Sequence, residues 1–100
     1  MEEYKVIIFP SAQDDLTDIA EILNATSPGE AARYLDLLIE TAEPLKTAPE
    51  SRPLAKDVQF RLRGYRTLPV KNTIIFYSFS GKIVGLRRIL FSRPQYEGMI

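Results

Sequence analysis

Residues 73–91 have the sequence TIIFYSFSGKIVGLRRILF, and this stretch decides the fold class. Isoleucine, valine, leucine, phenylalanine and tyrosine make up most of it, which is typical of β-strands. Ser80-Gly81 supplies a turn signal near its middle. We therefore predict two strands, Thr73–Phe79 and Lys82–Phe91, paired as an antiparallel hairpin.

The segments on either side are predicted to add further strands. Gln59–Arg63 and Tyr65–Val70 have a similar composition, and Lys71-Asn72 supplies the next turn. Near the start of the chain, Tyr4–Phe9 is a short β-branched and aromatic run, predicted as a buried strand. We expect it to join the sheet at an edge or beside the last strand.

The hydrophobic residues between the first strand and residue 46 follow helical spacing. The first helix is predicted to begin at Ser11, an N-cap in a capping box with Asp14, and to end near Asn24. A second helix is predicted with Ser27 as its N-cap and Pro28 at its first position. The side chains expected to face the sheet are Leu16, Ile19, Leu23, Leu35, Leu38 and Leu45.

These elements together predict an α+β domain. An N-terminal strand and a helical hairpin should pack on one face of a mainly antiparallel sheet of four to five strands. The other face of the sheet is expected to point outward and to carry most of the arginines. Because no linker or composition break divides the chain, we expect residues 1–100 to form a single domain.

The composition excludes several kinds of chemistry. The chain contains no cysteine and no histidine, so disulfides, thiolate nucleophiles and the usual zinc ligands are absent. We therefore expect no metal and no cofactor. The apolar run at Tyr4–Phe9 is too short to span a bilayer and lacks the features of a signal peptide, so we expect a cytoplasmic protein without membrane contact.

The two halves of the chain carry opposite charge. Residues 1–50 hold 3 basic and 11 acidic side chains, a net charge of −8, whereas residues 51–100 hold 10 basic and 2 acidic ones, a net charge of +8. No acidic residue occurs between Val58 and Tyr96. This asymmetry indicates a basic face for a polyanion or an acidic partner, and the alternative is that the two halves pair with each other.

Arginines in the second half are the candidate binding residues. Arg61 and Arg63 are two apart in a predicted strand and should share a sheet face, with Arg66 nearby. A guanidinium keeps its charge and binds phosphate through two hydrogen bonds, which suits a nucleic-acid or ribosome surface, although a solvated strand face is the alternative. Arg87 and Arg88 are adjacent and should point to opposite faces, one of them holding a carboxylate of the helices.

Several segments resemble, in order along the chain, the toxins of the RelE/ParE superfamily. They are Lys5-Val6-Ile7, Pro10-Ser11-Ala12, Arg52-Pro53, Gly64-Tyr65-Arg66, Ile75-Phe76-Tyr77 and Leu86-Arg87-Arg88-Ile89-Leu90. The resemblance covers nearly the whole chain and implies the toxin of a type II toxin–antitoxin module, of the kind that stabilises plasmids. It also identifies Arg88 as the family's usual arginine, so we expect Arg88 to hold the helix carboxylate.

The resemblance implies two alternative targets. Members of the RNA-cleaving branch cut mRNA on the ribosome, and Arg66, Arg93 and Tyr96 match its catalytic residues loosely. However, Leu68 and Ile74 stand where that branch often has basic residues.

The ParE-like branch fits better, also because Phe91 replaces the histidine with which many relatives end the last strand. That branch is linked to poisoning of DNA gyrase by binding, so we favour a gyrase inhibitor over a ribonuclease. The tail Ser92–Ile100 is expected to contribute to toxicity. Contacts with the target or partner are expected from Arg61, Arg63, Arg66, Arg88, Arg93 and Tyr96.

A toxin of this kind implies a partner that silences it. We expect a small cognate antitoxin whose acidic and apolar segment folds on binding to the basic face, giving a toxin–antitoxin hetero-oligomer. The remaining alternative is an inactive relative that acts only as an antitoxin-binding module.

Overall fold

The computed structural model describes residues 3–92 of the chain. Within this range a first strand precedes two long helices, two short 3-10 helices and a third α-helix, and three strands follow. The elements are β1 (Lys5–Ile8), α1 (Pro10–Thr26), α2 (Glu30–Ala42), η1 (Glu43–Lys46), η2 (Pro49–Ser51), α3 (Val58–Leu62), β2 (Arg66–Val70), β3 (Thr73–Ser80) and β4 (Ile83–Phe91).

Within the described residues, four strands form one sheet in the order β1-β4-β3-β2. β3 pairs antiparallel with both β2 and β4, whereas β1 lies parallel to β4 at an edge of the sheet. A parallel neighbour requires a crossover, and all the other elements described within residues 3–92 lie in the crossover between β1 and β4. The predicted sheet and the place of the first strand are confirmed.

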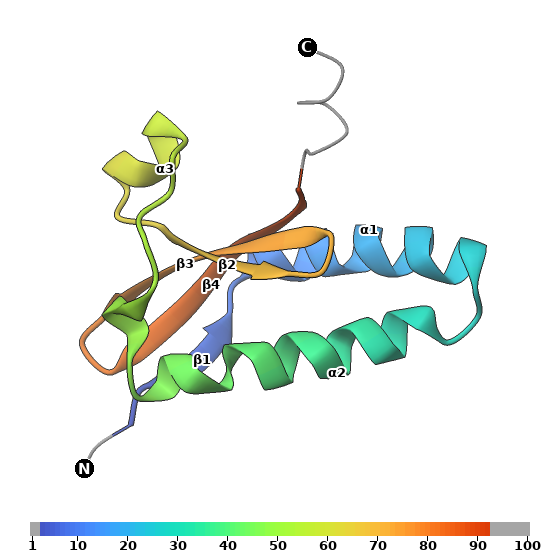
Figure 1. Cartoon of the computed structure of the whole chain (residues 1–100), viewed down its shortest axis with the longest axis horizontal. Helices are drawn as coiled ribbons and strands as arrows, with labels where there is room; N and C mark the ends of the chain where they lie inside the picture. The colour runs from blue at the N-terminus through green and yellow to red at the C-terminus, as the bar shows by residue number, and fades with distance from the viewer. Residues whose placement is uncertain (1–2, 93–100) are drawn as a thin grey trace.

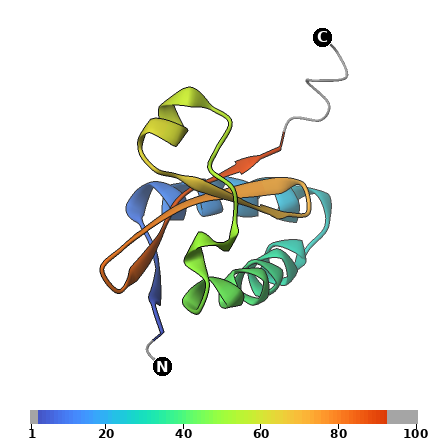
Figure 2. The same ribbon diagram turned by 60° about the vertical axis from the view of Figure 1, so that its left-hand side comes forward.

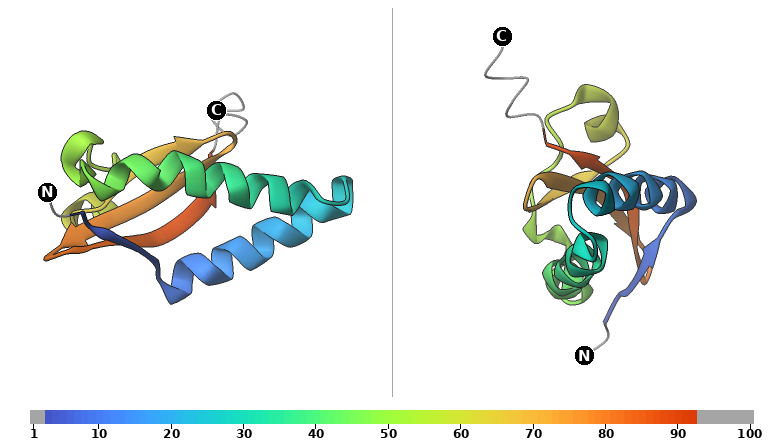
Figure 3. Two further views of the ribbon diagram at one scale, coloured as in Figure 1. Left: turned by 90° about the horizontal axis from the view of Figure 1, so that it is seen from below. Right: turned by 90° about the vertical axis from the view of Figure 1, so that its right-hand side faces the viewer.

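α1 and α2 form a helical hairpin that packs against the sheet and projects beyond it at the turn (Figure 1 and Figure 3). α1 contacts β4, and α2 contacts β2. The predicted α+β architecture is therefore confirmed. No helix within residues 3–92 is both long enough and apolar enough to cross a membrane. The largest side chains buried between the layers are Tyr77, Leu38, Leu45, Ile75, Leu86, Ile89 and Val84.

The side chains predicted to face the sheet do so with one exception. Those that are buried or packed partly buried against the core are Leu16, Ile19, Leu23, Leu38 and Leu45. The prediction is wrong for Leu35, whose side chain is 40% exposed. The buried positions of α2 are Tyr34, Leu38 and Ala42, spaced four apart, so the buried stripe passes beside Leu35.

α1 begins two residues earlier than predicted. Phe9 is the N-cap and Pro10 occupies the first helical position, so the Ser11 hydroxyl does not cap the helix. Proline is favourable there because it lacks the N–H group that would be unsatisfied in the first turn. The helix also continues to Thr26, past the predicted end.

α2 begins two residues later than predicted. Ser27 and Pro28 lie in the turn, and Gly29 is the N-cap with a left-handed φ of 85°. The side-chain oxygen of Asn24 accepts a hydrogen bond from the amide of Ala31 at 3.2 Å. The acceptor for the first turn of α2 therefore comes from α1, which local sequence spacing does not reveal.

The segment Gln59–Arg63, predicted as a strand, does not form one: Gln59–Leu62 belongs to α3, and Arg63 is the C-cap residue of that helix. The Asp57 carboxylate accepts a hydrogen bond from the amide of Phe60 at 3.1 Å, which is a typical N-cap contact. Gly64 follows the helix with a φ of 77°, the left-handed conformation that commonly ends helices. Capping at both ends outweighs the strand propensity of five residues. Figure 2 shows α3 on the opposite side of the sheet from α2.

The packing of α2 predicts a large effect of truncating its buried stripe. Leu38 is 1% exposed, so Leu38→Ala should lower the free energy of unfolding by about 2–5 kcal/mol, because it leaves a cavity. Leu35→Ala, the same change three residues earlier on the exposed side, should cost less than about 1 kcal/mol. Urea unfolding followed by circular dichroism measures both variants, and equal losses would contradict the described packing of α2.

Candidate functional site

A β-bulge in β4 breaks the alternation of its side chains. Phe76 of β3 lies opposite Arg88, whereas the next residue, Tyr77, lies opposite Leu86, so Arg87 is an extra residue in β4. Arg87 and Arg88 were predicted to point to opposite faces because strand residues alternate. That prediction is wrong: both arginines line the same hollow.

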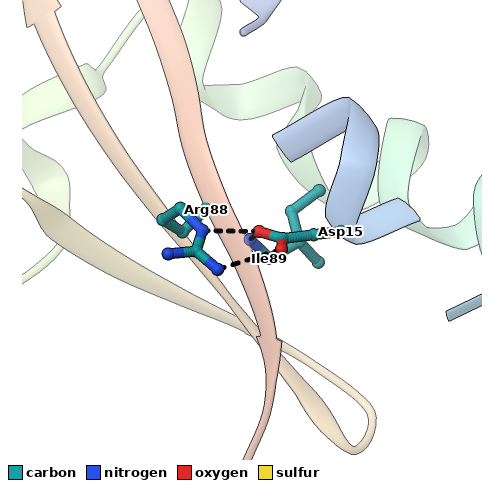
Figure 4. A network of polar contacts seen from close by, with 3 residues as sticks. All are labelled: Asp15, Arg88 and Ile89. Atoms are coloured by element: carbon teal, nitrogen blue, oxygen red, sulfur yellow. Dashed lines mark hydrogen bonds and ion pairs between the residues drawn. The ribbon is translucent and has the colours of Figure 1, made fainter. Parts of the chain in front are cut away.

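Asp15 of α1 binds the edge of β4 just beyond the bulge. Its carboxylate accepts two hydrogen bonds from Arg88, at 2.8 Å from Nε to Oδ2 and 3.0 Å from Nη2 to Oδ1 (Figure 4). Oδ2 also accepts the backbone N–H of Ile89 at 2.8 Å. The hydrogen bond from Arg88 raises the pKa of that guanidinium above its ordinary value. As expected, it is Arg88 that holds a carboxylate of the helices.

Arg87 packs on aromatic rings instead of pairing with a carboxylate. Its guanidinium carbon lies 4.1 Å from the centre of the Phe9 ring and 6.0 Å from that of Tyr65. Its Nε donates to the Ser78 hydroxyl at 3.1 Å. The Phe9 ring fits beneath it only because residue 85 is glycine, since a Cβ on Gly85 would lie 2.7 Å from this ring.

These side chains surround a hollow of about 280 Å³ on the face of the sheet that carries α3. It opens beside the first turn of α1. We call it the arginine hollow, and it is lined chiefly by Phe9, Phe60, Arg63, Tyr65, Arg87 and Arg88. The Phe60 ring packs against the rings of Tyr65 and Phe76, with centres 5.4 and 4.6 Å away. Cationic and aromatic groups are therefore interleaved around one small cavity.

The two arginines predicted to share a sheet face are separated. Arg61 lies on α3 and donates from Nη1 to the carbonyl of Lys56 at 3.2 Å. Arg63 is the C-cap residue of α3 and lines the arginine hollow. Within residues 3–92 no side chain forms a hydrogen bond or ion pair with the Arg63 guanidinium. Arg63 is consequently an uncompensated cation at this site.

Arg66 supports a loop and does not line the hollow. Its Nη1 donates to the carbonyls of Arg52 at 2.6 Å and Glu50 at 3.4 Å. Arg52 in turn donates from Nε to the carbonyl of Thr67 at 2.9 Å, so the loop and β2 are tied together in both directions. The guanidinium of Arg66 also lies 5.7 Å from the Phe79 ring. Arg93 and Tyr96 lie outside the described residues.

Ion pairs within the described residues do not neutralise the basic half of the chain. Two of them, Arg33–Glu30 and Lys46–Glu43, lie inside the acidic half. The pair Asp15–Arg88 joins the two halves. Within residues 3–92, no carboxylate pairs with the guanidiniums of Arg61, Arg63, Arg66 and Arg87. Pairing between the halves therefore accounts for little of the charge asymmetry.

Proton-transfer groups are scarce around the arginine hollow. Both oxygens of Asp15 are occupied by β4 donors. Burial raises the pKa of Tyr34 and of Tyr77, and their hydroxyls are hydrogen-bonded inside the core. No group of three acidic side chains within residues 3–92 is arranged to hold a metal ion. The site can stabilise negative charge and stack a planar group, but its described residues offer no acid–base pair.

Arg63 and Arg88 were predicted as binding residues, and both line the arginine hollow. Arg87 and the aromatic rings beside it were not predicted as binding residues, and Phe9 was predicted to belong to a buried strand. The available signal was Gly85, a glycine inside a predicted strand, which often marks a bulge or the close approach of another group.

Comparisons with known proteins agree with this architecture. A chain of the chromosomal ParDE TA system from P. aeruginosa has a similar fold, with a TM-score of 0.73 and 20% sequence identity over 89% of this chain and 96% of that chain. No curated protein matches the sequence significantly. The model of the family described as ParE toxin of type II toxin–antitoxin system, parDE, matches residues 6–96. The chain therefore belongs to the ParE toxin family.

The Asp15 contacts predict a specific loss of stability. Asp15→Ala removes the acceptor of the Ile89 amide and of Arg88, and should lower the free energy of unfolding by about 1–3 kcal/mol. Asp15→Asn keeps one oxygen acceptor and should lose less. Asp14→Ala, at an exposed neighbouring position, is the matched control and should have little effect. Chemical unfolding measures all three, and a stable Asp15→Ala variant would show that these bonds do not hold α1 on β4.

Proposed function

We propose that this ParE-family toxin arrests growth by binding DNA gyrase, and that a cognate antitoxin neutralises it. The ParE-like branch, which the chain resembles along its whole length, is linked to gyrase poisoning. Such a target lies in the cytoplasm, and such a module serves plasmid stabilisation. The observation that carries the proposal is the arginine hollow, which offers charge and aromatic surface without an acid–base pair.

The guanidiniums in the hollow suit binding more than bond cleavage. Arg63 and Arg87 have no carboxylate partner within residues 3–92. Arg88 bonds Asp15 through Nε and Nη2, so its Nη1 can still donate to a ligand. Arginine stabilises negative charge but exchanges protons poorly near neutral pH, because its pKa is above 12. A positioned acid or base contributes roughly 10²–10⁴-fold to catalysis, and the described lining of the hollow offers only the hydroxyls of Tyr65 and Ser11 for proton transfer, with no histidine or carboxylate beside them.

The basic outer face also suits the antitoxin. A second hollow of about 260 Å³ shares Phe60 with the arginine hollow; its lining is mostly apolar but includes one carboxylate, and consists of Asp57, Phe60, Ile74, Phe76, Leu90, Phe91 and Ser92. An acidic and apolar segment would place carboxylates near the arginines and hydrophobic anchors in the second hollow. The structurally similar chain belongs to a ParDE TA system, which supports a partner of this kind. Toxin and antitoxin would then form a hetero-oligomer.

Expression of the chain in a bacterial host, with and without its neighbouring small open reading frame, tests the proposal. The chain alone should trigger the DNA-damage response and trap gyrase-cleaved DNA, while mRNA stays intact at early times. Arg63→Gln and Arg87→Gln should weaken growth arrest. Co-expression of the antitoxin should restore growth and allow the two proteins to be purified together.

Two results would contradict the proposal. Cuts at codon positions in ribosome-bound mRNA, abolished by Arg93→Ala or Tyr96→Phe, would establish the ribonuclease instead. A chain that is harmless when expressed alone, yet still binds the antitoxin, would be an antitoxin-binding module without a toxic activity.

A further inference from the structure

We infer that the arginine hollow binds one nucleotide unit of single-stranded DNA, its phosphate held by Arg63 and Arg87 and its base stacked on the adjoining aromatic rings. This inference rests on the proposed function in one respect: DNA is the nucleic acid that a gyrase-directed toxin meets. It goes further by assigning the toxin its own contact with the nucleic acid, in addition to any contact with the enzyme.

The charges of the hollow favour an anion with more than one oxygen acceptor. Three guanidiniums and no carboxylate are among its described lining residues; Asp15 is paired with Arg88, and Asp57, which lines the second hollow, accepts a hydrogen bond from the Phe60 amide. Arg63 has no hydrogen-bonding partner within residues 3–92, and Arg87 is held in place by Phe9 and Ser78. Guanidiniums bind phosphate through parallel hydrogen bonds, and Arg87 is already oriented for this by its contacts.

The aromatic lining distinguishes a nucleotide from a simple anion. Phe60 and Tyr65 pack together beside the arginines, and both line the cavity. Proteins that bind single strands combine a cationic groove with aromatic platforms for the bases. A carboxylate side chain would pair with the arginines alone, whereas a nucleotide can place a phosphate on the arginines and a base against these rings. The two aromatic rings beside the arginines therefore favour a ligand in which a base lies next to a phosphate.

The size and surroundings favour a polymer over a free nucleotide. A cavity of about 280 Å³ lies just below the range of roughly 300–1,000 Å³ that holds drug-sized ligands, so it suits one unit of a chain. The second hollow shares Phe60, and although Asp57 also lines it, its rings Phe76 and Phe91 can take a neighbouring base. Because the two hollows adjoin at Phe60, they can take successive units of one strand.

Binding of fluorescent dT12 to the purified full-length chain, measured by anisotropy at 50 and 200 mM salt, tests the inference. Arg63→Gln should weaken binding about tenfold and reduce the salt slope by about one, because one phosphate contact is lost. Tyr65→Leu should weaken binding at least about fivefold with the slope unchanged, since stacking carries no charge. Arg33→Gln is the matched control: it removes the same charge from α2, and binding should stay within about twofold. Thermal unfolding of each variant verifies that it is folded.

Several results would overturn the inference. Equal losses for Arg33→Gln and Arg63→Gln would show that only net charge matters, and an unchanged Tyr65→Leu variant would exclude stacking. Displacement of dT12 by dTMP at equal nucleotide concentration would exclude the polymer, and tighter binding of rU12 would exclude DNA as the preferred strand. A chain that traps gyrase-cleaved DNA in cells but does not bind dT12 would overturn this inference alone and leave the proposed function standing.

Discussion

The carboxylate of Asp15 lies where the helical layer meets the unpaired edge of β4. β1 covers that edge only as far as Leu86, and the last bond of the pair runs from the Phe9 amide to the Leu86 carbonyl. Beyond this point the Ile89 amide would have no acceptor, and Asp15 supplies one from the second turn of α1. An aspartate that is 9% exposed thus replaces a missing strand partner, and its remaining charge is balanced by Arg88.

The arginine hollow depends on the same constraint. Once α1 is fixed against β4, Phe9 immediately before it is fixed as well, and its ring lies against the backbone of Gly85. That ring is the surface on which Arg87 rests. The bulge turns Arg87 and Arg88 to one side, so that one guanidinium is tied to the fold and the other remains available to a ligand. Structural and binding roles are divided between adjacent residues.

The sequence predicts the layers of this fold well because they follow from hydrophobic periodicity. The stripe through Ile19 and Leu38 and the strand runs around Ile75 and Leu86 are confirmed. The predictions failed where helix capping or contacts between distant parts of the sequence determine the local structure. Gln59–Arg63 has strand-forming composition, but the Asp57 cap and Gly64 favour a helix that ends at Leu62. The carboxylate that bonds β4 beside the bulge lies more than 70 positions away in the sequence, and Gly85 alone does not reveal that Arg87 and Phe9 meet there.

Charge repulsion among the arginines is not balanced by ion pairs within the described part of the fold. Arg61, Arg63, Arg66 and Arg87 have no carboxylate partner within residues 3–92, although the acidic half of the chain supplies abundant carboxylates. Arg63 and Arg87 line one hollow together with Arg88, and like charges so close together repel each other. Pairing the two halves would relieve that repulsion, yet the acidic helices lie on one face of the sheet and the arginine hollow on the other.

A molecule polarised in this way orients a polyanion during approach, because the helical face repels it and the sheet face attracts it. The aromatic rings between the arginines then decide which polyanion is retained, since charge alone attracts every acidic surface and stacking selects planar groups.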